Sequence, residues 1–358
     1  LVLVLHLSAT RAADKEPVVL VTPVVYGTHL PGLGKPAIRL AKRIDQRSRG
    51  GLKLDLKEPG DGTQPYEILD KVSEGAVDAG FSMSSFWTAK IPAAPLFSGY
   101  PFGPDAEGYL AWFGEGNGRK LYQEMYDQAG YKVHVIPCAF GGAEAGGWFT
   151  KELDSKKDID GLRMRIFGLG ARVMSRLGTI PVLVAGGDLV KAFERHKIEA
   201  AEFYTPAVDR EQGLQDEIKL IYMPGWHQPA TVLELLINKD RWNGLGAERQ
   251  KLVESACAAT LESTLGESAG LQAEALASFS TKDSVRVADW PEEVVAALRE
   301  AWGEVAKEQG SHDYFFKEVL EDIAKFQEGA NGATGATPEP GPKDTPSEAP
   351  PTESSDRR

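Results

Sequence analysis

Two segments of the chain carry a charged side chain in surroundings that suit the binding of a small anion. Glu144 is the lone charge in the glycine-rich stretch 140–149, and Arg165 lies near the end of the alternating stretch 162–166. Glycines let a backbone approach a ligand closely, and the guanidinium fork can donate two parallel hydrogen bonds to a carboxylate. The alternatives are a glycine-rich turn with a solvated Glu144, and an ordinary surface ion pair for Arg165.

Two further segments combine oxygen-bearing side chains with aromatic residues. Glu202 and Phe203 stand in the run 202–206, and Gln228 lies in the proline-bounded run 224–229. Oxygen donors beside aromatic rings fit a small polar ligand that is held by a hard cation. The alternative is a pair of proline-bounded loops whose aromatic rings pack in the core.

Signatures of enzymes are missing from the sequence. It has no phosphate-binding P-loop, no H-E-x-x-H helix and no G-x-S-x-G elbow, and its six histidines show no metal-ligand spacing. Cys138 and Cys257 can pair in an oxidising compartment, but we expect two separate, partly buried thiols. These observations favour a binding protein over an enzyme.

The elements that must position these residues alternate between helix and strand. The sequence predicts a helix over 37–44, a strand over 52–56, a helix over 68–72 and a strand over 77–81. Similar segments recur at 161–166 and 195–200. The fold class is therefore α/β, and we expect two related lobes with a ligand cleft between them, braced by helices beyond residue 240. Coincidence between common α/β patterns is the alternative.

Composition limits the function further. The chain has 358 residues, which suits about two domains, and its net charge of −12 argues against nucleic-acid partners and a polybasic membrane anchor. No apolar stretch approaches the roughly 18 residues that a membrane helix needs. We expect residues 1–13 to be a signal-peptide remnant, 14–328 to be the two-lobed domain and 329–358 to be a disordered tail rich in Pro, Gly, Ser and Glu. A buried first strand is the alternative for the N-terminal run.

An ordered set of segments resembles one protein family from about Val18 to about Gln327. The sequence is similar to the periplasmic solute-binding proteins of tripartite ATP-independent (TRAP) transporters, the DctP type. Within that family it resembles the branch that binds 2-oxo acids and other monocarboxylates with a metal ion. The segments that carry the resemblance are 146–149, 161–166, 177–178, 185–187, 198–202, 224–227 and 233–239. Any one of them is weak, whereas their order is specific.

The resemblance assigns roles to residues of this chain. It implies that Arg165 anchors the ligand carboxylate, and that Glu144, Glu202, Phe203 and Gln228 surround the ligand and a Na⁺ or Ca²⁺ ion, Phe203 through its backbone oxygen. Two positions depart from the family pattern. Glu144 replaces the usual Gln, and Gln228 replaces an acid. We interpret this as a compensating exchange that retains the metal; the competing interpretation is a changed metal or ligand class. Phe203 replaces a frequent Trp, which leaves the size of the pocket open.

The resemblance also implies a cellular role. The protein would lie in the periplasm, close its lobes around a small carboxylate and deliver it to TRAP membrane subunits, either as a monomer or as a homodimer. The alternatives are an extracytoplasmic lyase or hydrolase that uses Glu144 as its base, and a sensor that presents its ligand to a membrane kinase.

Overall fold

Alternating leucines build the first strands. Leu52 and Leu54 face the core in β2 (Leu52–Lys57), which pairs in parallel with β1 (Val18–Pro23). The amphipathic helix α1 (Lys35–Arg47) packs beside them through its apolar face. The computed structural model describes residues 16–334, so the expected signal-peptide remnant lies outside it.

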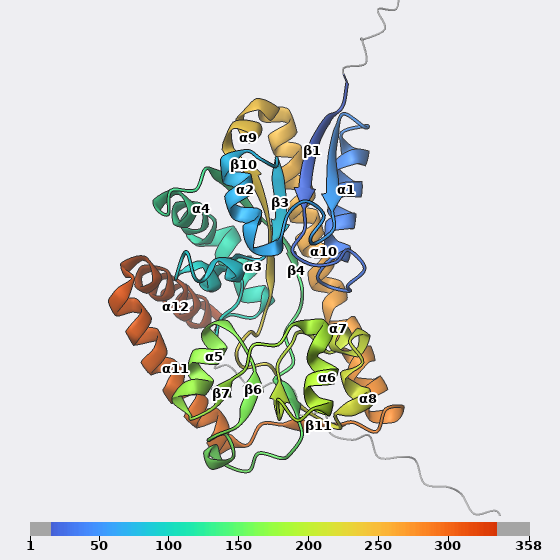
Figure 1. Ribbon diagram of the computed structural model, residues 1–358. Helices are drawn as coiled ribbons and strands as arrows, with labels where there is room; N and C mark the ends of the chain where they lie inside the picture. Colours follow the sequence, from blue (N-terminus) through green and yellow to red (C-terminus); the bar gives the residue numbers. More distant parts are fainter. Residues whose placement is uncertain (1–15, 335–358) are drawn as a thin grey trace, which may run out of the picture.

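The first lobe, lobe I, contains these strands and a three-stranded antiparallel sheet in the order β3-β10-β4. Figure 1 shows it as the upper half of the molecule, with helices around the sheets. Its other elements are α2 (Ile68–Glu74), β3 (Ala79–Ser82), α3 (Ala106–Glu115), α4 (Gly118–Gln128), β4 (Val133–Phe140), β10 (Val232–Asn238) and α9 (Lys239–Leu245). Short 3-10 turns lie at Pro65–Glu67, Ser84–Trp87 and Ala94–Phe97.

The second lobe, lobe II, is built on one mixed sheet in the order β11-β9-β5-β8-β6-β7. Strands β6 and β8 run parallel, whereas β5 is antiparallel to both of its neighbours. The strands are β5 (Gly147–Phe149), β6 (Arg163–Arg165), β7 (Ile180–Pro181), β8 (Ala200–Ala201), β9 (Leu220–Met223) and β11 (Arg286–Asp289). The helices are α5 (Gly168–Arg176), α6 (Leu189–Glu194), α7 (Pro206–Glu211) and α8 (Leu214–Glu217), with 3-10 turns at Lys156–Asp158 and Gly186–Asp188.

Three segments of the chain pass between the lobes. Residues 141–146 connect β4 to β5, residues 224–231 connect β9 to β10, and the long helix α10 (Ala247–Thr281) runs from lobe I to lobe II. Helices α11 (Glu292–His312) and α12 (Tyr314–Thr334) brace the two lobes, since α11 packs on α5 and α12 packs on α3 and α4. Helix α12 includes the first residues of the segment 329–358 that we expected to be a tail, and residues beyond 334 lie outside the described part.

The expectation of two separate thiols is wrong. Cys138 on β4 and Cys257 on α10 form a disulfide with their Cα atoms 4.3 Å apart. Both side chains are completely buried. Strand β4 packs directly against α10, and this packing joins cysteines that are 119 residues apart in the sequence.

The predicted fold class is confirmed. The structure has two α/β lobes with bracing C-terminal helices, and the predicted helix and strand segments around 37–81 are present within a few residues. Among residues 16–334, every helix is too short or too polar to cross a membrane.

Candidate functional site

The chain segments that cross between the lobes carry three polar residues of one cluster. Glu144 lies on the first crossing segment, and His227 and Gln228 lie on the second. The two segments are joined by hydrogen bonds from Gly225 N to Glu144 O at 2.9 Å and from Glu144 N to Gln228 O at 3.2 Å. Gly225 permits this approach, because a Cβ there would lie 2.4 Å from the Glu144 carbonyl oxygen.

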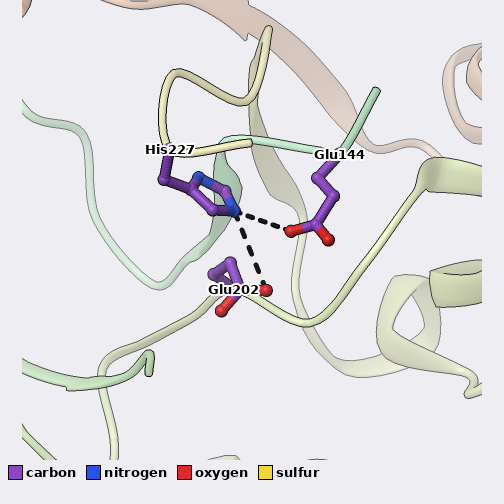
Figure 2. A group of neighbouring side chains, drawn as sticks. All are labelled: Glu144, Glu202 and His227. Carbon is purple, nitrogen blue, oxygen red and sulfur yellow. Dashed lines mark hydrogen bonds and ion pairs between the residues drawn. The ribbon is translucent and has the colours of Figure 1, made fainter. Parts of the chain in front are cut away.

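Glu144, Glu202 and His227 form a compact buried group (Figure 2). Their side chains are 4%, 2% and 7% exposed. His227 Nε2 lies 2.8 Å from Glu144 Oε2 and 3.8 Å from Glu202 Oε1. Glu202 comes from the residue directly after β8 in lobe II, so the group joins that lobe to both crossing segments.

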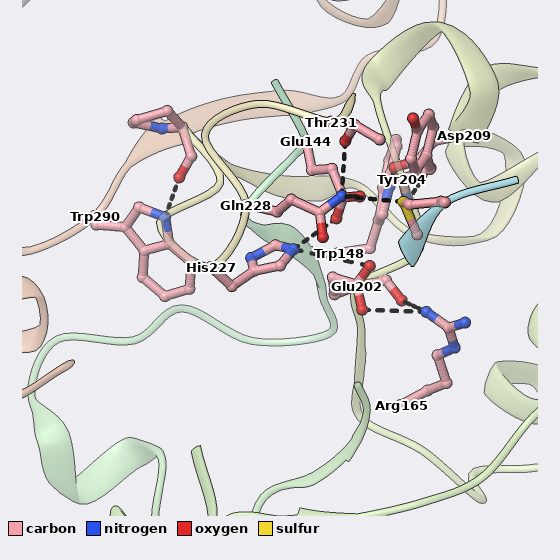
Figure 3. A network of polar contacts seen from close by, with 12 residues as sticks. Glu144, Trp148, Arg165, Glu202, Tyr204, Asp209, His227, Gln228, Thr231 and Trp290 are labelled. Carbon is pink, nitrogen blue, oxygen red and sulfur yellow. Dashed lines mark hydrogen bonds and ion pairs between the residues drawn. The ribbon is translucent and has the colours of Figure 1, made fainter. Parts of the chain in front are cut away.

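Gln228 holds Glu144 in place. Its Nε2 donates to Glu144 Oε1 at 2.6 Å and lies 2.6 Å from Thr231 Oγ1, as Figure 3 shows. The side-chain nitrogen of Gln228 is therefore engaged, and its side-chain oxygen, Oε1, is the atom left to meet a ligand.

Arg165 reaches the same group from the end of β6. Its Nη1 donates to the Glu202 backbone oxygen and, at 3.1 Å, to Glu202 Oε2. The rings of Phe167 and Phe203 flank the guanidinium, with their centroids 5.1 and 5.3 Å from its Cζ. Aromatic faces hold a guanidinium in place through cation–π attraction. Arg165 is thereby positioned at the edge of the cleft.

The protonation equilibria of the group are strongly shifted. Burial raises the pKa of Glu144 well above its usual range, and the nearby Glu202 charge adds to this rise. Burial also acts to raise the pKa of Glu202, but Arg165 and His227 outweigh it and hold this pKa below its ordinary value. Burial lowers the pKa of His227, yet the two carboxylates more than compensate and raise it. Two acids thus share one buried site with two basic side chains.

Several buried polar atoms of the site lack a hydrogen-bond partner among the described residues. They include Glu202 Oε1, His227 Nδ1 and Tyr204 Oη. A buried carboxylate oxygen without a hydrogen bond is costly, and a bound cation would satisfy it. One ligand atom from each of Glu144, Glu202 and His227 lies within 4.8 Å of the others. The donor set therefore fits a metal ion.

Two adjoining cavities meet at this group. A small one of about 30 Å³ is lined by Glu144, Glu202, His227 and Gln228 among others. A larger one of about 550 Å³ contains Arg165, Phe203 and Tyr204, and the apolar side chains of Phe86, Ile166 and Val184 also line it. Glu144 lines both. The small cavity suits an ion or a water molecule, and the larger one suits a small organic molecule.

The structure brings together all five residues named from the sequence, namely Glu144, Arg165, Glu202, Phe203 and Gln228. Sequence reasoning missed His227, because its partners Glu144 and Glu202 lie 83 and 25 positions earlier and show no ligand spacing. Its place between Trp226 and Gln228 in a proline-bounded segment was the available signal.

Comparison with known proteins places these features in one family. The sequence profile of the bacterial extracellular solute-binding proteins, family 7 (DctP), matches residues 32–313. A monocarboxylate 2-oxoacid-binding periplasmic protein of Nostoc sp. is 33% identical over 288 residues, which are 80% of this chain and 78% of that protein.

Two crystal structures of TRAP periplasmic solute-binding proteins share the fold closely. The protein from Colwellia psychrerythraea, with bound calcium and pyruvate, has a TM-score of 0.83 and 28% identity, covering 89% of this chain and 97% of that one. The protein from Pseudoalteromonas atlantica, with bound sodium and pyruvate, has a TM-score of 0.82 and 28% identity, covering 89% and 96%. The resemblance that the sequence motifs indicated is confirmed: the chain belongs to the DctP family of bacterial extracellular solute-binding proteins, the receptors of TRAP transporters.

Proposed function

We propose that this receptor captures a small monocarboxylate, a 2-oxo acid or a close relative, together with a cation, and delivers it to TRAP membrane subunits. The observation that carries the proposal is the pair of adjoining cavities: one has the size and donors for an ion, the other contains Arg165, and Glu144 lines both. The ligands named for the Nostoc, Colwellia and Pseudoalteromonas relatives support the same ligand class.

Each residue has a defined task in this proposal. Arg165 donates to the ligand carboxylate, and the Tyr204 hydroxyl, which has no partner among the described residues, donates to a ligand oxygen. Glu144, Glu202 and His227 hold the cation, with the Phe203 backbone oxygen and the Gln228 carbonyl oxygen as additional donors. A bound cation supplies positive charge that neutralises the buried carboxylates and attracts the oxygens of the ligand. Apolar walls such as Phe86 and Ile166 exclude water when the lobes close.

The closing motion follows from where the cluster lies. Glu202 and Arg165 belong to lobe II, whereas Glu144, His227 and Gln228 lie on the crossing segments. A ligand that contacts both sets binds the closed arrangement of the lobes more tightly than the open one, and it therefore shifts the protein towards the closed arrangement. Opening of the lobes separates these contacts and releases the ligand.

Calorimetry tests the proposal. Pyruvate and larger 2-oxo acids are titrated into the full chain after its metals have been removed by a chelator, with and without added cation. We expect binding with a cation and much weaker binding without one. Undiminished binding to the metal-free protein would exclude the cation from the site.

The family and fold are those of receptors rather than enzymes, and we propose that the chain does not transform its ligand. Incubation with pyruvate, followed by NMR, tests this, since turnover would favour the lyase or hydrolase alternative. Periplasmic location and a homodimer also belong to this proposal. Cell fractionation and sedimentation velocity test them.

A further inference from the structure

A shallow depression lies on the surface of lobe II, next to the ligand cavity. It has a volume of about 420 Å³ and is formed by the segment 182–185 together with α6 and the residues that follow this helix. The segment 182–185 also lines the larger cavity of the proposed ligand site. One short stretch of chain therefore faces both the cleft and an outer surface.

Apolar side chains beside this depression are open to solvent. Leu183, which lines it, is 97% exposed, and Ile180 in β7 is 52% exposed. Strand β7 stands at one end of the strand order of the lobe II sheet, so its outer side is a sheet edge. Proteins usually cover or charge an apolar sheet edge, because it invites association with another chain. An uncovered leucine at this place is typical of a surface that binds a partner.

The charge of the depression is opposite to that of the whole chain. The lining residues include the bases Lys191, Arg195 and Lys197 and the acid Asp188, which gives a local net charge of +2 in a chain of net charge −12. All three bases are exposed. Asp188 lies 3.9 Å from Lys191, and no acid among residues 16–334 forms an ion pair with Arg195 or Lys197. The surface therefore favours a partner that carries carboxylates.

The shape and size of the patch favour a protein partner over other occupants. A concave surface does not follow a flat bilayer, and basic sites for anionic lipids typically contain about four to eight basic residues. A second copy of the chain is disfavoured as well, because a two-fold dimer brings the same patch of both subunits together. Such a dimer would place bases opposite bases.

We propose that this depression is the docking surface of lobe II for the TRAP membrane subunits, and that it receives a periplasmic segment in which carboxylates flank an apolar side chain. The proposal rests on the proposed function for the identity of the partner. Lys191, Arg195 and Lys197 pair with the carboxylates, and Leu183 packs against the apolar side chain.

This position also brings the docked partner close to the ligand site. Val182 N donates to Met164 O at 2.9 Å, so the segment 182–185 begins beside β6, the strand that ends at Arg165. The same segment lines the ligand cavity. A membrane subunit in the depression therefore contacts a part of the chain whose other side meets the solute.

Charge reversal tests the docking surface. The docking variant, Lys191→Glu/Arg195→Glu/Lys197→Glu, is compared with the wild-type full chain. Binding of each receptor to the cognate membrane subunits in phosphatidylcholine nanodiscs is measured by biolayer interferometry, with and without pyruvate and Ca²⁺. Uptake of pyruvate into proteoliposomes that contain the same subunits is measured in parallel.

A matched control variant changes the net charge by the same amount on another surface. It is Arg119→Glu/Lys307→Glu/Lys325→Glu, which replaces exposed bases of α4, α11 and α12. Figure 1 shows these three helices on the left of the molecule and α6 on the right. Calorimetry with pyruvate and circular dichroism check that both variants fold and bind their solute.

We expect the wild type and the control variant to bind the membrane subunits alike. The docking variant should bind them about 10-fold more weakly or worse, because like charges then oppose each other across the interface. Added salt should weaken docking of the wild type. The pyruvate affinity of the docking variant should equal that of the wild type, since the three bases lie outside the ligand cavity.

Equal docking of the wild type and the docking variant would overturn the inference. An equal loss in the control variant would also overturn it, since net charge alone would then explain the effect. Equal binding to anionic-lipid nanodiscs without the subunits would place a membrane in the depression instead. Self-association in sedimentation velocity that the docking variant abolishes would place a second copy there.

The two readouts distinguish this inference from the proposed function. If the wild type docks, the docking variant does not and no pyruvate is taken up, the docking surface stands and the proposed solute is wrong. If the wild type and the docking variant support equal uptake, the proposed function stands and the docking surface is wrong.

Discussion

Two buried carboxylate clusters in this molecule behave in opposite ways. In lobe I, Glu234 is completely buried and accepts hydrogen bonds from Ser82 at 2.8 Å, Trp87 at 3.1 Å, Tyr122 at 2.6 Å and Tyr126 at 2.8 and 2.9 Å. In the cleft, Glu202 is almost as deeply buried, yet its Oε1 has no hydrogen-bond partner among the described residues.

The difference teaches how to distinguish a structural acid from a binding acid. Burial is nearly the same in both clusters, so burial alone does not separate them. The two clusters differ instead in how many hydrogen-bond donors the protein supplies to the carboxylate oxygens. Both oxygens of Glu234 are satisfied by the protein and need no ligand, whereas the cleft acids face each other and an unsatisfied oxygen remains for a partner from outside.

Truncation of Glu234 should have the largest effect on stability. Glu234→Ala leaves two tyrosine hydroxyls, an indole N–H and a serine hydroxyl without their acceptor. We expect the free energy of unfolding to fall by about 3–5 kcal/mol, measured by urea denaturation. Pyruvate affinity of the folded fraction should be retained. A loss below about 1 kcal/mol would show that the cluster is not a structural one.

Replacement of Arg165 should show the reverse pattern. Lysine cannot form the two-pronged hydrogen bond to a carboxylate, and hydrogen bonds to charged groups contribute about 1.5–3 kcal/mol. We therefore expect Arg165→Lys to weaken pyruvate binding by about 10- to 100-fold, measured by calorimetry. The melting temperature without ligand should change little. Unchanged affinity would remove Arg165 from the site.

Measurement of stability as a function of pH should reveal the shifted proton equilibrium of Glu234 in the structural cluster. Burial raises the pKa of Glu234 above its ordinary value, although its donors act to lower it. The folded chain therefore keeps this proton to a higher pH than the unfolded chain does. The resulting stabilisation is complete below about pH 4.5 and declines as the pH rises through the folded pKa.

Glu234→Gln lacks this proton equilibrium. We expect the difference in unfolding free energy between the wild type and Glu234→Gln to decrease from pH 4.5 towards pH 8, measured by denaturant titration at each pH. A difference that grows over this range would contradict the raised pKa.

The smallest effect on stability is expected for Glu144→Gln. Glutamine keeps one acceptor oxygen, for either His227 or Gln228, and the loss of the second contact is offset because one of two neighbouring buried acids is removed. The free energy of unfolding should change by no more than about 1 kcal/mol, whereas cation affinity should fall. A destabilisation as large as that of Glu234→Ala would place Glu144 among the structural acids.

The sequence predicted much of the fold, because hydrophobic periodicity is a local property. The alternating leucines of β2 and the apolar face of α1 are readable from neighbouring residues. The disulfide was not predictable, because it depends on the packing of β4 against α10. The same limit explains Glu234, whose donors come from positions 82, 87, 122 and 126.

The candidate site was predictable only where motifs carried it. Glu144, Arg165, Glu202, Phe203 and Gln228 stand out through their glycine, strand and proline surroundings. His227 does not, since its role arises only when β8 and the two crossing segments meet. The engagement of the Gln228 amide by Glu144 is likewise a property of the assembled site.

Glu144, which lines both cavities, has a consequence for how the receptor reads its surroundings. In the proposed function the ion in the small cavity and the solute in the large one both contact this residue, and whatever factor one event contributes to the affinity of the other is returned equally. Occupancy then follows the product of two concentrations rather than either one alone. If the calorimetry shows the cation to be required, the receptor will stay empty in a medium that offers the solute without the ion.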